Sequence, residues 1–327
     1  MNNSIIQNWE NTSSASPIFI IGCQRSGTTL LRTILHSHPD ISIGYECAFY
    51  KLLAQKYDCS IPINERLEEF IEDLYRVRRF DLWNLEKRYL RQEFLKIDRE
   101  VSFSQAVLLI AELYRRENKP KASFVGFKNP NGIFHLPYIF DLFPNAKVIH
   151  IMRDVRGLLA SEKKKRKRMS IDTYDAASCL WDVSQRYKRA VNTYVDYKND
   201  DRVHTLFFHD LIQNIDETTA RLSDWLNIDH HDLMLSYFKL NNEKKLTPDS
   251  ELWQHKKTME APDRKRIDAF KNELDSSELR AVELLFKNEI NRFSGVIEIQ
   301  SISLKGVPLI LKSFGTRAIK KFLINSD

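Results

Sequence analysis

The sequence predicts an α/β fold of three layers, in which helices flank a central parallel sheet of about five strands. Short apolar runs rich in β-branched residues alternate with longer segments that have the apolar spacing of helices. The first of these runs leads directly into a glycine-containing loop and then into a helical pattern. The chain has 327 residues, of which 43% are hydrophobic, so it is long enough to bury a large core.

Five runs bounded by polar or proline-containing turns are the expected strands. They cover residues 17–21, 41–43, 123–127, 147–152 and 203–208. The segment after the first strand, residues 28–36, has the leucine and isoleucine spacing of a helix. Further helical patterns are expected at residues 65–83, 103–116, 171–197, 216–226 and 264–292.

The domain organisation follows from these patterns and from the two ends of the chain. Residues 1–16 form a polar tail, and residues 17–300 form one domain whose helical insert, residues 47–122, is expected to cap the carboxyl edge of the sheet. Residues 301–327 are basic and amphipathic. The favoured role of this last segment is a helix packed on the domain, and the alternative is peripheral contact with a membrane.

The net charge of the chain indicates which ligands it could bind, and its cysteine content indicates the redox compartment in which it works. A formal net charge of +6 suits an anionic ligand or surface without distinguishing a nucleotide from a membrane. The cysteines, Cys23, Cys47, Cys59 and Cys179, have neither a CxxC pair nor metal-ligand spacing, so free thiols and a reducing compartment are expected. The sequence lacks a signal-peptide pattern and a long apolar run. We therefore expect a soluble, cytoplasmic protein without a metal.

The loop GCQRSGTTLL, residues 22–31, predicts an anion site. A glycine-containing turn into a helix presents backbone N–H groups and the positive end of the helix dipole to an anion. Gly22, Gly27 and Thr29 fall in register with the triphosphate-binding pattern GxxxxGK[ST], but Thr28 replaces its lysine. This replacement disfavours a nucleoside triphosphatase. A helix cap that binds nothing is the alternative, but such a cap does not need this glycine spacing.

Three blocks carry a resemblance to a known family. They are PIFIIGCQRSGTTLLRTILHSHPDISIGYE, then FVGFKNP with LPYIFDLFPNAKVIHIMRDVRGLLAS, and then VHTLFFHDLIQNIDETTARLSDWLNI. In this order they resemble the sulfotransferases that use 3′-phosphoadenosine 5′-phosphosulfate (PAPS), particularly the branch of tyrosylprotein sulfotransferases and their bacterial relatives. The resemblance covers most of residues 17–228. It implies a P-loop-like fold, PAPS as co-substrate without a metal, and a hydroxyl-bearing acceptor.

The resemblance also implies which residues hold the donor. The first loop would hold the 5′-phosphosulfate through Arg25, Ser26, Gly27, Thr28 and Thr29. Arg153, after the fourth strand, and Ser161, eight positions later, would hold the 3′-phosphate. Taken alone, an arginine followed by aspartate at a strand end is more often an ion pair at a helix start.

The catalytic residues that the resemblance implies are Glu46, Lys128 and Arg25. Glu46 in IGYE matches the family's catalytic glutamate and would act as general base, although Tyr45 stands where the family commonly has a second glutamate. Lys128 in GFKNP would offset charge on the leaving-group oxygen, and Arg25 would add a second positive charge there. Another branch of the superfamily uses a histidine base after this strand. The nearest candidate here is His135, which ranks below Glu46.

The sequence also contains two basic segments whose roles can be predicted, and it leaves two alternative functions open. The run KKKRKR, residues 163–168, is expected to be a solvated helix face that attracts the nucleotide, with nucleic-acid binding as the alternative. Lys256 and Lys257 are candidates to close over the donor. A kinase-like phosphotransferase is the alternative enzyme, and a non-catalytic protein that binds nucleic acid or an anionic membrane is the alternative of another class. We expect no nucleic-acid partner, and a glycan, lipid, small molecule or tyrosine is left open as the acceptor.

Overall fold

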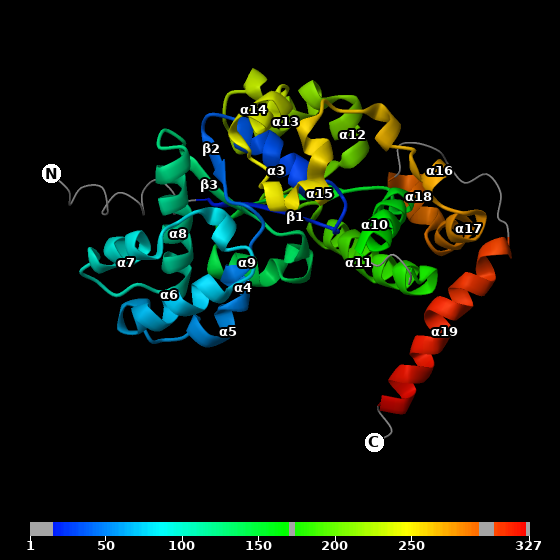
Figure 1. Cartoon of the computed structure of the whole chain (residues 1–327), viewed down its shortest axis with the longest axis horizontal. Coiled ribbons are helices and arrows are strands. Elements are labelled where there is room, and N and C mark those ends of the chain that lie inside the picture. Colours follow the sequence, from blue (N-terminus) through cyan, green and yellow to red (C-terminus); the bar gives the residue numbers. More distant parts are fainter. Residues whose placement is uncertain (1–15, 170–173, 294–303, 325–327) are drawn as a thin grey trace.

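The structure, a computed structural model, describes residues 16–169, 174–293 and 304–324 (Figure 1). Its strands are β1 (Ile18–Gly22), β2 (Ile41–Ile43), β3 (Phe124–Lys128), β4 (Lys147–Met152) and β5 (Val203–Phe207). They form one sheet in the order β2-β3-β1-β4-β5, and every neighbouring pair is parallel. The predicted five-stranded parallel sheet is confirmed, with strand ends that differ from the expected ones by at most one residue.

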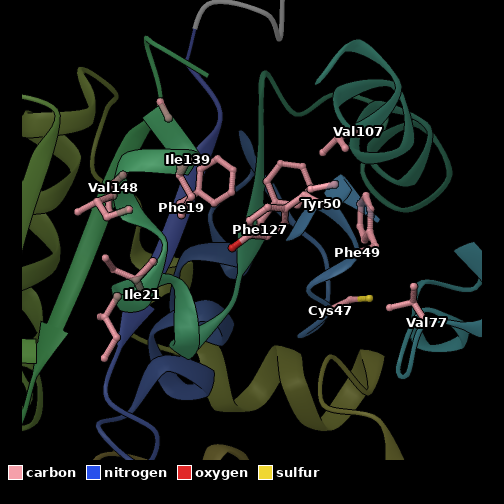
Figure 2. Packing of buried hydrophobic residues seen from close by; sticks show 14 of the residues in the cluster. Phe19, Ile21, Cys47, Phe49, Tyr50, Val77, Val107, Phe127, Ile139 and Val148 are labelled. Atoms are coloured by element: carbon pink, nitrogen blue, oxygen red, sulfur yellow. The ribbon is translucent and has the colours of Figure 1, made fainter. Parts of the chain in front are cut away.

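The sheet is buried on both faces, which explains why its strands are continuous apolar runs rather than alternating ones. In β1, Ile18 and Ile20 pack into one hydrophobic cluster, whereas Phe19 and Ile21 pack into the other. Figure 2 shows the second cluster, where Phe19 lies beside Phe127 of β3 with ring centroids 4.9 Å apart. The two clusters are the contacts between the sheet and its two helical layers, so the three-layer architecture is confirmed.

Helices of one layer contribute apolar side chains to the cluster that contains Ile18 and Ile20. They are α3 (Thr28–Ser37), α12 (Phe208–Gln213), α13 (Ile215–Leu226) and α14 (Tyr237–Lys244). The opposite layer includes α8 (Phe103–Asn118), α9 (Leu136–Leu142), α10 (Val155–Met169) and α11 (Ala176–Tyr197). Short 3-10 helices occur at Ile63–Arg66, Asp81–Trp83, Pro130–Phe134, Asp232–Met234, Asp249–Glu251, Lys256–Met259, Arg264–Arg266 and Leu304–Gly306.

The insert, residues 47–122, adds α4 (Phe49–Leu52), α5 (Ala54–Tyr57), α6 (Leu67–Arg76) and α7 (Lys87–Leu95) before α8. Much of it packs on the face of the sheet, because α8 contacts β2 and β3 and its apolar residues join the Phe19 cluster. The turn that follows α6 lies at the carboxyl end of β2, where Trp83 Nε1 donates to the Tyr45 carbonyl at 3.0 Å. Through this turn the insert reaches the carboxyl edge of the sheet.

The helical pattern at residues 264–292 is divided into several short elements. These include α16 (Phe270–Glu273), α17 (Ser276–Leu285) and α18 (Lys287–Phe293). Asp275 starts α17, because its carboxylate accepts hydrogen bonds from the backbone N–H groups of Ser277 and Glu278. A capping box of this kind ends any helix that approaches from the amino-terminal side. The apolar spacing alone did not reveal this break.

The last helix, α19 (Val307–Ile324), lies along α11 and α17 (Figure 1). Phe314 packs edge-on against Trp181 of α11, with ring centroids 4.8 Å apart. The first part of α19 is therefore packed on the domain. Within the described ranges, no helix is both long enough and apolar enough to cross a membrane. All four cysteines are free thiols.

The topology places a binding crevice beside β1. From β1 the chain turns through α3 to β2 at one edge of the sheet, whereas β4 and β5 lie on the other side of β1. Neighbouring connections that leave in opposite directions open a crevice at the carboxyl ends of parallel strands. The loop after β1 and the ends of β3 and β4 meet at this crevice.

Candidate functional site

A cavity of about 570 Å³ lies at the carboxyl edge of the sheet. All five strands deliver residues to its lining: Arg25 after β1, Glu46 after β2, Lys128 in β3, Arg153 after β4 and Phe208 after β5. Parallel strands end on the same side of a sheet, so residues far apart in the sequence meet here. Cations dominate the charged lining. They are Arg25, Arg78, Arg79, Lys128, Arg153, Lys164, Lys165, Arg168, Lys257 and Arg266, against Glu46 and Glu273.

The loop between β1 and α3 forms a tight turn into the helix. The Ser26 N–H donates to the Cys23 carbonyl at 3.0 Å, and α3 begins directly after Gly27. Gly27 has a φ of 108°, and a Cβ there would lie 2.7 Å from Cδ2 of Phe208. Glycine is therefore required by both backbone conformation and space. Within the described residues, the buried Ser26 hydroxyl has no hydrogen-bond partner. A loop with exposed helix N–H groups and an unpaired buried hydroxyl suits an anion.

Three arginines meet beside this loop. Arg153 Nη1 donates to the Arg25 carbonyl at 3.0 Å and Nη2 donates to the Arg266 carbonyl at 3.4 Å. The guanidinium of Arg153 lies over the ring of Phe208, 4.3 Å from its centroid. Burial, together with the charges of Arg266 and Arg25, lowers the pKa of Arg153 to about 9. In the described part of the chain, none of the three arginines has a carboxylate within ion-pair distance, although more distant carboxylates such as Glu162 and Glu273 partly offset their positive charge.

Ser161 joins the same group from α10. Its hydroxyl accepts a hydrogen bond from Arg25 Nε at 3.1 Å, and it lines the cavity with Arg153. Thr28 and Thr29, the first residues of α3, also line the cavity. The residues that the sequence assigns to the donor thus lie at one end of the cavity, with Ser26 buried beneath its lining.

Glu46 lies between two cations. One carboxylate oxygen is paired with Lys128 Nζ, and the other accepts from Arg79 Nη1 at 2.6 Å. Burial opposes ionisation of Glu46, but Lys128 and Arg79 outweigh it and lower its pKa to about 2. Lys128 is 2% exposed, and its own pKa is lowered by burial against the opposing effect of Glu46. Glu46 is therefore ionised at neutral pH and lies against the buried amine of Lys128.

The structure separates the candidates that the sequence left open. Lys257 lines the cavity with Trp253 and His255, whereas Lys256 is absent from the lining. His135, the alternative base, also lies outside the lining, at the amino-terminal cap of α9. Of these candidates, the geometry favours Glu46 over His135 as the residue that meets a substrate in the cavity.

The basic run at residues 163–168 is largely compensated by acidic partners. Lys163 is paired with Glu278, Lys164 with Glu273 at 2.5 Å, and Arg166 with Asp182 at 2.6 Å. Arg168 Nη1 donates to the Trp253 carbonyl at 2.9 Å. Because Lys164, Lys165 and Arg168 also line the cavity, the run belongs to the site rather than to a separate surface.

Several residues of the site were missed by sequence reasoning. They are Arg79, Glu251, Arg266 and Phe208. Arg79 comes from the insert, and the sequence around it has no pattern that places it beside Glu46. Burial, with the charges of Lys128 and Arg25, lowers the pKa of His255 to about 3, so its imidazole is neutral at pH 7. Arg266 lies in the basic stretch RKR, which was the one available signal.

A metal site is not apparent in the part of the chain that the structure describes. Within residues 16–169, 174–293 and 304–324, no group of three or more histidine, cysteine, aspartate or glutamate side chains could hold a metal ion. The charged lining of the cavity is mostly cationic, which repels a metal cation.

Known proteins resemble the chain in both sequence and fold. The protein-tyrosine sulfotransferase of Drosophila melanogaster is 24% identical over 237 residues, a match that covers 71% of this chain and 42% of that protein. The chain thus spans less than half the length of that relative. The sulfotransferase domain of the Synechococcus PCC 7002 olefin synthase has a TM-score of 0.51 at 16% identity, covering 94% of this chain and 96% of that domain. Mouse sulfotransferase SULT7A1, complexed with PAP, has a TM-score of 0.50 at 15% identity, covering 94% and 93%.

The sequence profile of the sulfotransferase family matches residues 17–232. That range contains all five strands of the sheet and the loops that carry Arg25, Glu46, Lys128, Arg153 and Ser161. The match covers about two thirds of the chain, and the fold agrees with solved sulfotransferases. The chain therefore belongs to the sulfotransferase family.

Proposed function

We propose that this protein transfers a sulfuryl group from PAPS to a hydroxyl-bearing acceptor. The observation that carries the proposal is the group of Arg25, Arg153 and Arg266, which gather at one end of the cavity without a carboxylate partner among the described residues. Clustered, partly buried guanidinium groups repel one another, and an anion with several phosphate oxygens relieves that repulsion.

The two phosphate positions of PAPS have separate candidate partners. The loop N–H groups at the start of α3, with Arg25, Ser26, Gly27, Thr28 and Thr29, would hold the 5′-phosphosulfate. Arg153 and Ser161 would hold the 3′-phosphate, and Arg266 adds a third guanidinium. At the same end of the cavity, the ring of Phe208 packs against the guanidinium of Arg153 and supports its position.

The reaction needs a base and a cation near the sulfur. The acceptor oxygen forms a bond to sulfur while the bond from sulfur to the 5′-phosphate oxygen breaks, and adenosine 3′,5′-bisphosphate leaves. Glu46 would take the proton of the acceptor hydroxyl, and Lys128 and Arg25 would offset the charge that develops on the leaving phosphate. The remaining contribution is alignment, as in phosphoryl transfer.

The alternative functions are less well supported. The loop has Thr28 where a kinase-like enzyme needs a lysine, and the cavity lining is mostly cationic rather than rich in magnesium-binding carboxylates. Nucleic-acid binding through residues 163–168 is disfavoured because Lys163, Lys164 and Arg166 are already paired with carboxylates. The acceptor is proposed as a hydroxyl compound, and the geometry does not select among a glycan, a lipid, a small molecule and a tyrosine.

Calorimetry on the purified chain tests the proposal. Adenosine 3′,5′-bisphosphate should bind in the absence of magnesium and more tightly than ATP, and Arg153→Ala should weaken this binding at least tenfold. Mass spectrometry should then detect a sulfated product when PAPS is supplied with phenol, a tyrosine peptide, a sugar or a fatty alcohol. Tighter binding of magnesium ATP than of the bisphosphate would refute the donor assignment.

A further inference from the structure

Arg79 joins two acidic residues that come from distant parts of the chain. Its Nη1 donates to Glu46 at 2.6 Å, and its Nε and Nη2 donate to the two carboxylate oxygens of Glu251 at 2.8 and 2.9 Å. The three side chains are 18%, 25% and 10% exposed, respectively, so water screens these contacts only weakly. The planar, forked guanidinium contacts Glu251 through two nitrogens and Glu46 through the third, whereas a lysine, with a single charged nitrogen, cannot make the two-nitrogen contact with Glu251.

The backbone at Arg79 adds a second, independent observation. Its φ is 72°, in the left-handed region that a side chain normally avoids. Asparagine or glycine would adopt this conformation more easily. A strained non-glycine residue persists only where its surroundings fix it, and such residues cluster at functional sites. The turn would form more easily with glycine or asparagine at this position, so the side chain of Arg79 has a role other than forming the turn.

Glu251 belongs to a segment that borders the cavity. We call residues 249–259 the strap, because Trp253, Gln254, His255, Lys257 and Thr258 from this segment line the cavity. Within the strap, Glu251 forms an ion pair with Arg79. Two residues later, the Trp253 carbonyl accepts a hydrogen bond from Arg168. Arg79 thus connects the strap to Glu46, because it forms ion pairs with both Glu251 and Glu46.

We infer that Arg79 is a positioning residue, which orients the Glu46 carboxylate toward the acceptor and holds the strap over the cavity. This inference rests on the proposed function, in which Glu46 is the base and Lys128 serves the donor. When Lys128 engages the donor, Arg79 becomes the remaining cation that keeps Glu46 ionised and in place. Because Arg79 also holds Glu251, the position of the strap and the orientation of the base are linked through this side chain.

The strap is tested without any turnover, on the full chain. Hydrogen exchange of residues 249–259, followed by mass spectrometry, should be at least tenfold faster in Arg79→Gln, because its neutral amide cannot form ion pairs with the two carboxylates. Arg79→Lys should give a smaller acceleration, because it loses the two-nitrogen contact with Glu251. The matched control is Arg76→Gln, since Arg76 is 76% exposed and its ion pair is with Asp73 at 3.1 Å. Unchanged exchange of the strap in both Arg79 variants would overturn the inference, as would equal acceleration throughout the protein.

The base is tested by a pH profile of PAPS consumption with phenol as the probe acceptor. The charged and titratable groups that face Glu46 are Lys128, Arg79, His255, Arg25 and Tyr45. Losing Arg79 raises the pKa of Glu46, so the acid limb of the rate should move up by about one pH unit in Arg79→Gln. Arg79→Lys keeps a positive charge beside Glu46, so its acid limb should stay close to that of the unmodified chain. An unmoved acid limb in Arg79→Gln contradicts the inference.

Failure of the inference and failure of the proposed function give different results. Arg79 has its ion pairs with Glu46 and Glu251, away from the arginine group, so Arg79→Gln should bind adenosine 3′,5′-bisphosphate within about twofold of the unmodified chain. If the unmodified chain does not bind the bisphosphate, the proposed function is wrong, whereas normal binding with unchanged strap exchange overturns only the role of Arg79.

Discussion

Glu46 is the residue whose surroundings say most about the chemistry. Lys128 and Arg79 hold its pKa at about 2 despite burial, so the carboxylate is ionised at any physiological pH. A carboxylate whose pKa is lowered by two neighbouring cations is a weak base. Its pKa rises, and it becomes a stronger base, when one of these cations pairs with another anion instead. In the proposed reaction the leaving phosphate would be such an anion, and proton transfer to Glu46 would then be linked to departure of the nucleotide product.

The first prediction concerns this carboxylate. Glu46→Gln should lower the rate of sulfuryl transfer by about 10²- to 10⁴-fold, because the amide cannot accept the acceptor's proton. Binding of adenosine 3′,5′-bisphosphate should change little, since the arginine group is untouched. Initial rates of PAPS consumption and calorimetry measure the two effects. Full turnover in Glu46→Gln would exclude Glu46 as the base.

His150 in β4 gives a prediction for stability. It is fully buried, neither ring nitrogen has a partner within the described residues, and burial lowers its pKa to about 4. The unfolded chain has a histidine pKa near 6.5, so between about pH 6.5 and 4 only the unfolded state takes up the proton. The contribution to stability is full above about pH 6.5 and is lost as the pH falls toward 4. Chemical denaturation of His150→Leu should show a flatter pH dependence over this interval than the unmodified chain.

At the scale of single elements, the junction of β1 and α3 shapes the end of the cavity that Arg25 and Arg153 line. Gly27 has a left-handed φ of 108° and leaves no room for a Cβ beside Phe208. Gly27→Ala should therefore destabilise the fold by about 1–3 kcal/mol and weaken bisphosphate binding, because the helix start must move. Urea denaturation and calorimetry test this expectation.

Gly315 in α19 is the matched control for that substitution. A Cβ at Gly315 would meet nothing within 4 Å. Gly315→Ala should therefore leave bisphosphate binding unchanged, and it should stabilise α19 slightly because alanine favours a helix more than glycine does. Equal losses in both variants would mean that the position of Gly27 has no special role.

The helices and strands were predictable from the sequence where a short run of residues itself carries the apolar pattern of the element. Residues Ile41–Ile43 and Lys147–Met152 are apolar because they are buried between two helical layers, and their bounds were predicted without error. The division of residues 264–292 was missed, because the cap at Asp275 depends on backbone geometry that an apolar pattern does not encode.

The site was predictable only in part, for a related reason. Arg25, Glu46, Lys128 and Arg153 follow strands, so the sequence order of strand and loop locates them together at one edge. Arg79 and Arg266 reach the same cavity from a turn of the insert and from a late segment, and Glu251 contacts Arg79. Their positions depend on tertiary packing, which no local spacing records.

At the scale of the whole molecule, the positive lining couples ligand binding to stability. Adenosine 3′,5′-bisphosphate should raise the thermal midpoint, because a ligand that binds only the folded state at 100 times its dissociation constant adds about 2.7 kcal/mol. The rise should shrink as salt is added, because ions screen the attraction between the phosphates and the arginine group. Arg153→Ala should reduce the rise at low salt, and an equal rise in that variant would argue against the arginine group as the binding site.

The arginine group has a further consequence for turnover. Arg25, Arg153 and Arg266 would contact phosphates that are present in PAPS before transfer and in adenosine 3′,5′-bisphosphate afterwards, so they cannot distinguish spent donor from fresh donor. The leaving phosphate gains negative charge when the sulfuryl group departs, so these arginines hold the product at least as firmly as the substrate. In the proposed reaction we therefore expect release of the bisphosphate to limit turnover, and accumulated bisphosphate to inhibit competitively with PAPS.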